Sequence, residues 1–499
     1  MVTTMLSAGI VGLVAERQPF AALAAVLVAP LLFAVILHSA ELATLAVVGI
    51  LYSNAAVVAV QFHNVPYVLG TSVPVLLVIP LASYLVLRRE KIIINDVLRL
   101  LVLFLVVQLA GVLFSGNINV SANTLFNFVI EGLGIYFLIT NVVRTPQMLR
   151  RVVWILVITG ALLGGLSLYQ QITHTYGNNY WGFAQMSSGM FGTGVENLQG
   201  EVLQRRLAGP IGEQNRYAQM MLMLVPLGLF RLFGERNHLW RGVALLATIL
   251  ISTGVALTFS RGAAIGLILM LAIMAFMRYI KPFQIVLLLL AVAIVLALVP
   301  QYATRLSSLE TLAGFADQDS GGLASSDGST QSRVTEMLAA GLVFVDYPLI
   351  GVGPGMFRYY YQDYARIVGL RVLASDRQAH SLYFGLAAEN GILGLTTFLA
   401  IVFVTLLNLA RTRKTWMKSR PDLALMATGF MLALVSYMIT GIFLHFAYIR
   451  FFFLVLALAG AATHVADTQL STQASASSGS SIAHADMERS TQNARRVSV

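Results

Sequence analysis

Long apolar runs separated by short polar segments make up most of the chain. Runs such as 20–37, 96–114 and 283–299 are almost free of charged residues and match the roughly 20 residues that a helix needs to cross a bilayer. The pattern predicts an all-α integral membrane protein. The apolar stretches lie near 20–39, 41–60, 67–87, 96–115, 124–143, 151–170, 216–233, 240–258, 262–278, 283–299, 381–409, 423–444 and 446–465.

The first two apolar stretches leave the number of crossings open. Counted separately, they give thirteen crossings and an N-terminus outside the cell. If 20–60 is one crossing plus a re-entrant or interfacial piece, about twelve helices remain and both ends are cytoplasmic. We prefer twelve. Residues 1–17 lack the basic segment of a cleaved signal and carry Glu16 and Arg17 instead.

Composition agrees with the apolar pattern. Hydrophobic residues are 58% of the 499 and charged residues 11%, with a mean hydropathy of +0.79. Cysteine is absent, which excludes disulfides, thiolate metal sites and cysteine nucleophiles. The net charge of +10 comes largely from short basic loops, which mark the cytoplasmic side of membrane proteins. It is therefore an orientation signal, and we expect no nucleic-acid partner. These loops carry Arg88, Arg89 and Lys91; Arg144, Arg150 and Arg151; Arg236 and Arg241; Arg278 and Lys281; and Arg411, Arg413, Lys414, Lys418 and Arg420.

This orientation places three segments outside: 116–123, 173–215 and 300–379, the last of them long and partly helical. We expect one transmembrane domain, 1–465, followed by a disordered cytoplasmic tail, 466–499, because the tail has few large apolar residues to offset its ordering entropy. Residues 317–332 are rich in Gly, Ser and Asp and are predicted to form a flexible loop.

Arginine is the only strongly basic residue type in the two long outer segments. Arg205 and Arg206 lie in the first and Arg333 in the second, and neither contains lysine. A guanidinium binds phosphate oxygens in a bidentate manner, which an ammonium group does not. Salt bridges to nearby carboxylates are the alternative for most of these arginines. Arg261 stands between two apolar runs, and an ionisable residue at that depth is a functional candidate by default, although it could simply anchor a helix end.

His380 stands where the long outer segment meets a membrane helix. A neutral imidazole can take a proton from an attacking hydroxyl, although a single His at a helix end is more often a cap or an interface residue. Glu389 follows in the same helix, where it pairs with a buried Arg or precedes the break at Asn390-Gly391. Gly353 lies in a glycine-rich turn whose backbone amides could approach an anion.

We expect neither a metal nor a cofactor. The chain has no HExxH, no Gly-x-Ser-x-Gly and no cysteine cluster. Asp317 and Asp319 form a D-x-D of the kind that metal-dependent glycosyltransferases use, but they fall within the predicted flexible loop.

Four segments in order resemble the O-antigen ligase family, within the superfamily of ligases, O-antigen polymerases and O-linked oligosaccharyltransferases. They are RLAGPIGEQNRYA (206–218), TFSRGAAIG (258–266), SRVTEMLAAGLVFVDYPLIGVGPGMF (332–357) and HSLYFGLAAENGILGL (380–395).

The resemblance implies transfer of a glycan from undecaprenyl diphosphate to lipid A–core at the periplasmic face of the bacterial inner membrane, without metal, as part of lipopolysaccharide biosynthesis. Its two important arginines and histidine fall on Arg261, Arg333 and His380, with Arg206 as a further diphosphate-binding candidate. Membrane lipids surround the protein, and a monomer is expected. The supporting candidates are Arg205, Asn215, Gly353, Tyr383 and Glu389.

The residues fit that chemistry. Guanidinium groups in a dry site stabilise the charge that develops on a leaving diphosphate, and His380 would orient or deprotonate the acceptor hydroxyl. A single displacement would invert the anomeric configuration. The alternatives are an O-antigen polymerase, a protein O-oligosaccharyltransferase and, in another class, a lipid-linked glycan transporter. A transporter is expected to have charges deep along its helices, and Glu131 is the clearest such charge.

Overall fold

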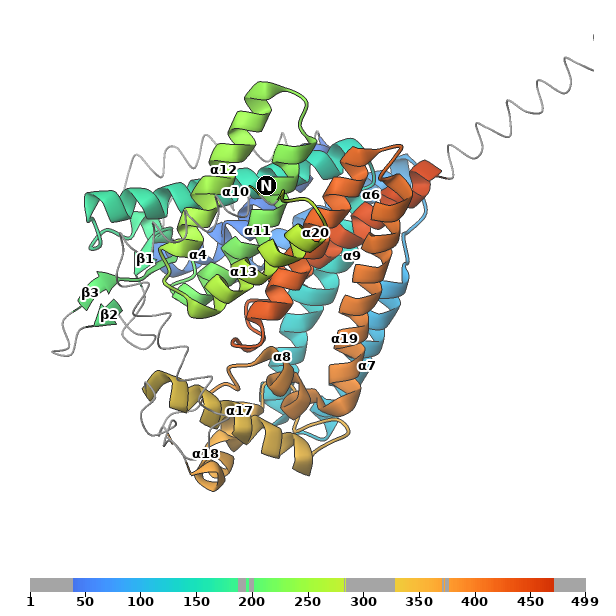
Figure 1. Cartoon of the computed structure of the whole chain (residues 1–499). Helices are drawn as coiled ribbons and strands as arrows, with labels where there is room; N and C mark the ends of the chain where they lie inside the picture. The colour runs from blue at the N-terminus through green and yellow to red at the C-terminus, as the bar shows by residue number, and fades with distance from the viewer. Residues whose placement is uncertain are drawn as a thin grey trace, which may run out of the picture.

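A computed structural model describes residues 39–186, 194–196, 202–281, 283, 328–369, 372 and 377–470. Helices form one bundle, with α17 (Gly328–Asp346) and α18 (Phe357–Val368) gathered at one end of it (Figure 1). We refer to this end as the α17 end. The architecture is that of an all-α membrane protein, as predicted.

Eight helices of the described residues are long and apolar enough to cross a membrane. A ninth is possible if α3 (Ala40–Tyr52) and α4 (Ala55–His63), bent by 60°, form one broken span. The predicted total of twelve cannot be compared directly, because residues 1–38 and 284–300 lie outside the described residues. The eight are α7 (Asp96–Leu113), Ile118–Val142, α10 (Pro146–Thr173), α11 (Gln214–Gly234), α12 (His238–Ala256), α19 (Leu382–Trp416), α20 (Pro421–Thr440) and the last helix, Ile449–Leu470.

Shorter apolar helices complete the bundle. α13 (Arg261–Phe276) has 16 residues. The apolar run near 67–87 is divided into four short pieces rather than one span, and Pro74 and Pro80 fall within it, where each removes a backbone donor. These pieces are α5 (Tyr67–Thr71), η1 (Val73–Leu77), α6 (Val78–Ala82) and η2 (Ser83–Leu87).

Side-chain caps set the starts of several spans. The side chains of Asn95, Asn117 and Thr145 each accept a hydrogen bond from the backbone N–H three residues on, at the starts of α7, α8 and α10. Such caps satisfy amides that a helix start would otherwise leave without a partner. Pro146 follows Thr145 as the first helical residue of α10, where its missing N–H costs nothing.

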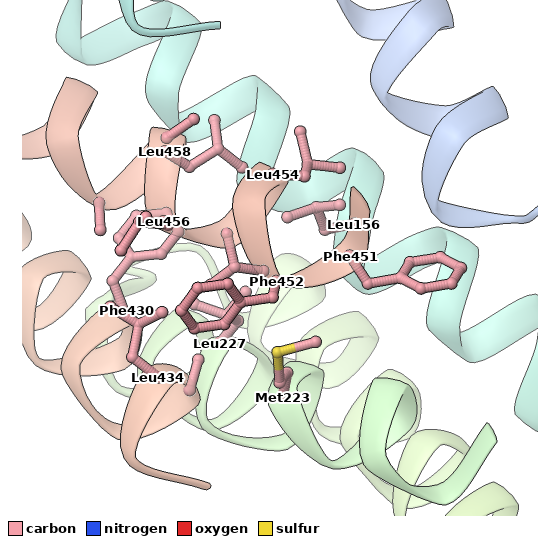
Figure 2. Close-up of a cluster of buried hydrophobic side chains, with 14 of the residues drawn as sticks. Leu156, Met223, Leu227, Phe430, Leu434, Phe451, Phe452, Leu454, Leu456 and Leu458 are labelled. Atoms are coloured by element: carbon pink, nitrogen blue, oxygen red, sulfur yellow. The ribbon is translucent and has the colours of Figure 1, made fainter. Parts of the chain in front are cut away.

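The interior lies among α11, α20 and the last helix. Of the apolar 18-residue stretch of each helix, 83% is buried inside the protein in the last helix and 33% in α12. The last helix is therefore enclosed by protein, whereas α12 faces outward. Figure 2 shows this packing: Met223 and Leu227 of α11 and Phe430 of α20 lie around Phe452 of the last helix. Helices in lipid gain little hydrophobic free energy by associating, because the lipid tails are as apolar as the helices. Close packing of this kind therefore holds the bundle together.

The structure refines three predicted segments. Most of 116–123, which was predicted to lie outside, is helix, because Asn117 caps α8 (Ile118–Asn127) and that helix runs through η3 (Phe128–Gly134) into α9 (Ile135–Val142). The predicted flexible loop 317–332 is helical from Gly328, where α17 begins; 317–327 lie outside the described residues. The last helix continues to Leu470, five residues beyond the predicted end of the transmembrane domain at 465; 471–499 lie outside the described residues.

The segment 173–215 contains short strands that the sequence analysis did not predict. After η4 (Tyr180–Gly182), β1 (Gln185–Met186) pairs antiparallel with β4 (Leu207–Gly209), and β2 (Gly194–Glu196) pairs antiparallel with β3 (Val202–Arg205). This fixes Arg206 between two strands.

The predicted basic loops meet one another at the end of the bundle away from α17. Arg144 lies 2.9 Å from Glu90, and Arg150 lies 2.5 Å from Glu235. Arg413 Nε donates to the Tyr279 hydroxyl. Each contact joins two loops that the charge pattern assigned to the same side of the membrane.

Candidate functional site

His380 is held against a buried carboxylate at the α17 end. It lies just before α19, with a left-handed φ of 45° that is uncommon outside glycine. Its Nδ1 is 2.6 Å from Glu336 Oε2 and 3.1 Å from the carbonyl oxygen of Gln378. Both are acceptors, so they favour a proton on Nδ1 and leave Nε2 as the basic nitrogen. The arrangement is that of a base oriented by a second group.

Glu336 is the residue on which this arrangement depends. It lies in α17 with 0% of its side chain exposed, and Arg377 Nε is 2.9 Å from its Oε1. A buried carboxylate is stable only when paired, and here Arg377 and His380 flank it. Arg333 lies one turn earlier on the same helix, in the i,i+3 position that shares a face. The sequence analysis treated Glu336 only as a salt-bridge partner.

A second histidine, which the sequence analysis missed, lies beside His380. The rings of His380 and His445 are 5.6 Å apart, edge to face. Burial lowers the pKa of His445 well below its ordinary value, and Arg216 and His380 lower the pKa further, so its imidazole is neutral at pH 7. The sequence signal that could have revealed His445 was its position as a single histidine within the apolar run 442–449.

Arg216 brings a buried positive charge to the same region. Only 2% of its side chain is exposed, in the first turn of α11. It donates to Gln219 Oε1 at 3.3 Å and lies 3.5 Å from Glu213 Oε2, whereas Nε and Nη2 have no hydrogen-bond partner among the described residues. Unsatisfied buried donors are costly, so this site favours an incoming anion. The sequence signal that could have revealed Arg216 was an arginine at the start of a predicted helix, where the helix dipole disfavours cations.

Arg206 joins two of the predicted motifs. It is buried, its Nε donates to the carbonyl oxygen of Thr258 at 2.9 Å, and its Nη2 donates to Asn215 Oδ1 at 3.2 Å. One donor thus ties the strand segment to the turn before α13, and the other ties it to the first turn of α11. Arg205, next to it, is exposed and lies over the ring of Tyr176.

Arg261 is the first residue of α13 and is half-buried. The next residue, Gly262, approaches Phe443 so closely that a Cβ there would be 3.3 Å from it. Phe443 belongs to the segment that carries His445. The fold therefore brings the start of α13 to the segment beside His380.

The remaining supporting candidates have structural contacts. The Tyr383 hydroxyl donates to the carbonyl oxygen of Met438 at 2.9 Å, which ties the start of α19 to α20. The Gly353 amide donates to the carbonyl oxygen of Glu389, and Glu389 Oε1 accepts from the amide of Phe357 at 3.4 Å. The Gly353 amide is therefore occupied within the protein rather than left for an anion. Glu389 caps α18 instead of pairing with an Arg, and it does precede the break in α19.

In the described ranges, no group of three or more His, Cys, Asp or Glu residues could hold a metal ion. Asp317 and Asp319 lie outside these ranges.

The family model described as O-Antigen ligase matches residues 246–399, a region that includes Arg261, Arg333, Glu336 and His380 and leaves Arg206, Arg216 and His445 outside. A search of curated proteins finds no match. The predicted resemblance is confirmed over residues 246–399, which match the O-antigen ligase family.

Proposed function

We propose that this protein is an O-antigen ligase. It transfers a glycan from undecaprenyl diphosphate to lipid A–core at the periplasmic face of the bacterial inner membrane. The observation that carries the proposal is the contact of His380 Nδ1 with Glu336 Oε2 at 2.6 Å. The buried guanidinium of Arg216 acts electrostatically on His445, whose ring lies beside that of His380. An oriented base beside a buried positive charge suits an attack on a sugar whose leaving group is a diphosphate.

The reaction is one displacement. His380 Nε2 takes the proton of the acceptor hydroxyl, and that oxygen attacks the anomeric carbon. The bond from this carbon to the diphosphate oxygen breaks, the configuration inverts, and undecaprenyl diphosphate leaves. Arg261 and Arg333 stabilise the charge on the diphosphate. Arg216 adds a third guanidinium, and Arg206 holds the strand segment against the start of α13.

A polymerase is the second candidate function, since it would use the same base and leaving group with a lipid-linked glycan as acceptor. A transporter has less support. Glu131, its main sequence signal, lies 2.9 Å from Arg450, and Arg450 also donates to Asn54 Oδ1 at 2.6 Å. The deep charge is thus part of an internal ion pair between helices.

Purified protein reconstituted with lipid-linked glycan tests the chemistry. We expect His380→Ala and Arg261→Gln each to lower transfer by about 10²- to 10⁴-fold, the usual contribution of a general base or a charge-stabilising group. His174→Ala and Arg366→Gln are matched controls, because both side chains are exposed and neither contacts the site. Normal transfer by His380→Ala would rule out His380 as the base. Transfer should persist in excess EDTA, and its loss there would point to a metal.

The acceptor decides between the two functions. Product that forms only when lipid A–core is present identifies a ligase. A lengthened lipid-linked glycan without lipid A–core identifies a polymerase.

A further inference from the structure

A polar cavity lies at the opposite end of the molecule from the His380 site. Its volume is about 390 Å³, and it is enclosed by the start of α7, the end of α19 and the end of the last helix. α19 runs between the two sites, with His380 just before its first residue and Trp416 at its last. The glycan transfer proposed above makes no use of this cavity.

The cavity wall contains a buried donor that the protein does not satisfy. Trp416 is 1% exposed, and its Nε1 has no hydrogen-bond partner among the described residues. Leaving a buried N–H unpaired costs about 1–3 kcal/mol. The cavity therefore favours a ligand that brings an acceptor to this indole.

Charges of both signs surround that donor. Arg411 lines the cavity and has no ion pair in the part of the chain that the structure describes. Asp467 and His464 also line the cavity, and Asp467 likewise has no ion pair among the described residues. Asp96, a third lining residue, lies 2.9 Å from Arg99. One guanidinium facing two carboxylates does not suit a dianion. It suits a zwitterion, whose phosphate lies at Arg411 and Trp416 and whose ammonium group lies at Asp467.

The surface beside the cavity suits an acyl chain. Phe403 and Leu407 precede Arg411 by eight and four residues and therefore share its face of α19. Phe403 is 61% exposed and Leu407 38%. In Figure 1, α19 runs alongside α7, which carries similarly exposed apolar side chains such as Val106. This stripe leads from the bilayer-facing surface to the cavity.

We propose that this cavity binds the headgroup of a zwitterionic aminophospholipid, with the acyl chain along the Phe403–Leu407 stripe. The phosphate accepts from Trp416 Nε1 and Arg411, and the primary ammonium group donates to Asp467. A phosphatidylethanolamine fits this description, whereas phosphatidylglycerol lacks the ammonium group and phosphatidylcholine lacks its N–H donors.

Native mass spectrometry of the full chain in detergent, with each of the three lipids added in turn, tests the proposal. We expect the wild type to retain phosphatidylethanolamine at concentrations where the other two are lost. Arg411→Gln and Trp416→Phe should each weaken this binding about tenfold, the effect of one charge-assisted hydrogen bond. Lys414→Gln and Trp240→Phe are matched controls, since both side chains lie outside the cavity lining. Asp467→Asn should remove the preference over phosphatidylglycerol.

Two results would overturn the proposal: equal retention of the three lipids by the wild type, or unchanged binding in Arg411→Gln, an exposed change that leaves the core intact. Displacement of the lipid by equimolar inorganic phosphate would also overturn it, because the cavity would then be a simple anion site. O-phosphoethanolamine should compete better than inorganic phosphate. None of these measurements depends on glycan transfer.

Discussion

At the scale of single residues, the candidate site depends on a buried carboxylate behind the proposed base. Glu336 is fully buried and lies between His380 and Arg377. Its carboxylate orients the imidazole of His380 and pairs with the guanidinium of Arg377. We therefore regard Glu336 as a positioning residue.

Glu336→Gln keeps the size of the side chain but removes its charge. We expect kcat for glycan transfer to fall about 10²-fold or more, because a misoriented base loses most of its contribution. The KM for lipid-linked glycan should change little, since Glu336 binds no donor group. Glu336→Asp should restore part of the activity.

Asp363→Asn is the control for that measurement, because it removes an exposed carboxylate whose ion-pair partner among the described residues is Arg366 on α18. An unchanged kcat in Glu336→Gln would contradict the positioning role. A loss confined to KM would instead assign Glu336 to substrate binding.

The sequence could reveal some of these residues and not others. His380 and Arg261 could be predicted because each is a polar residue that borders an apolar run, a pattern that the local sequence shows directly. The pairing of His380 with Glu336 spans 44 positions along the chain and arises only when α17 packs against α19. Arg216 was missed because it opens the predicted apolar run 216–233. Only folding shows that two of its buried donors have no hydrogen-bond partner among the described residues.

At the scale of elements, the break in α19 joins the membrane helix to the turn before α18. Gly391 has φ 62° and ψ −165°, a conformation essentially restricted to glycine. The chain at 349–350 packs directly on it, so that a Cβ would lie 2.2 Å from the carbonyl oxygen of Leu349. Two residues earlier, Glu389 accepts from the start of α18.

Gly391→Ala should therefore be disruptive. We expect a loss of stability of about 3 kcal/mol or more, from backbone strain together with the clash, and a loss of transfer as the 347–356 turn is displaced. Thermal melting in detergent, followed by size-exclusion chromatography, measures the first effect. Gly242→Ala is the control, since no atom lies within 4 Å of its would-be Cβ. Equal melting temperatures for the two variants would show that the break is not needed.

Hydropathy predicted most of the membrane helices of the described chain because burial in lipid requires long apolar runs with internally satisfied backbones. Hydropathy failed where an apolar composition and a long helix do not coincide. α8 is helical although its first turns are polar, and the run at 67–87 is apolar but divided into short helices. The strands at 185–209 are too short to leave a periodic pattern.

At the scale of the whole molecule, the two ends differ in their charged residues and in the roles proposed for them. Contacts between loops bring Glu90, Arg144, Arg150 and Glu235 together at one end. His380 and Glu336 lie at the other, where α19 begins, whereas Trp416 ends α19. Lys and Arg in short loops mark the cytoplasm, so the charge pattern predicts that the α17 end faces the periplasm, as a reaction on lipid-linked glycan requires.

The absence of cysteine makes this orientation directly measurable with single-cysteine variants. Gly177→Cys, between α10 and β1, and Ile367→Cys, on α18, should react with a membrane-impermeant maleimide in intact spheroplasts. Both positions are accessible: no atom lies within 4 Å of the would-be Cβ of Gly177, and Ile367 is 71% exposed. Arg241→Cys, in the exposed first turn of α12, and Lys418→Cys, in the exposed turn after α19, should react only after permeabilisation. The reverse pattern would place His380 in the cytoplasm, where the transfer proposed here has no acceptor, and would overturn the function while leaving the fold unchanged.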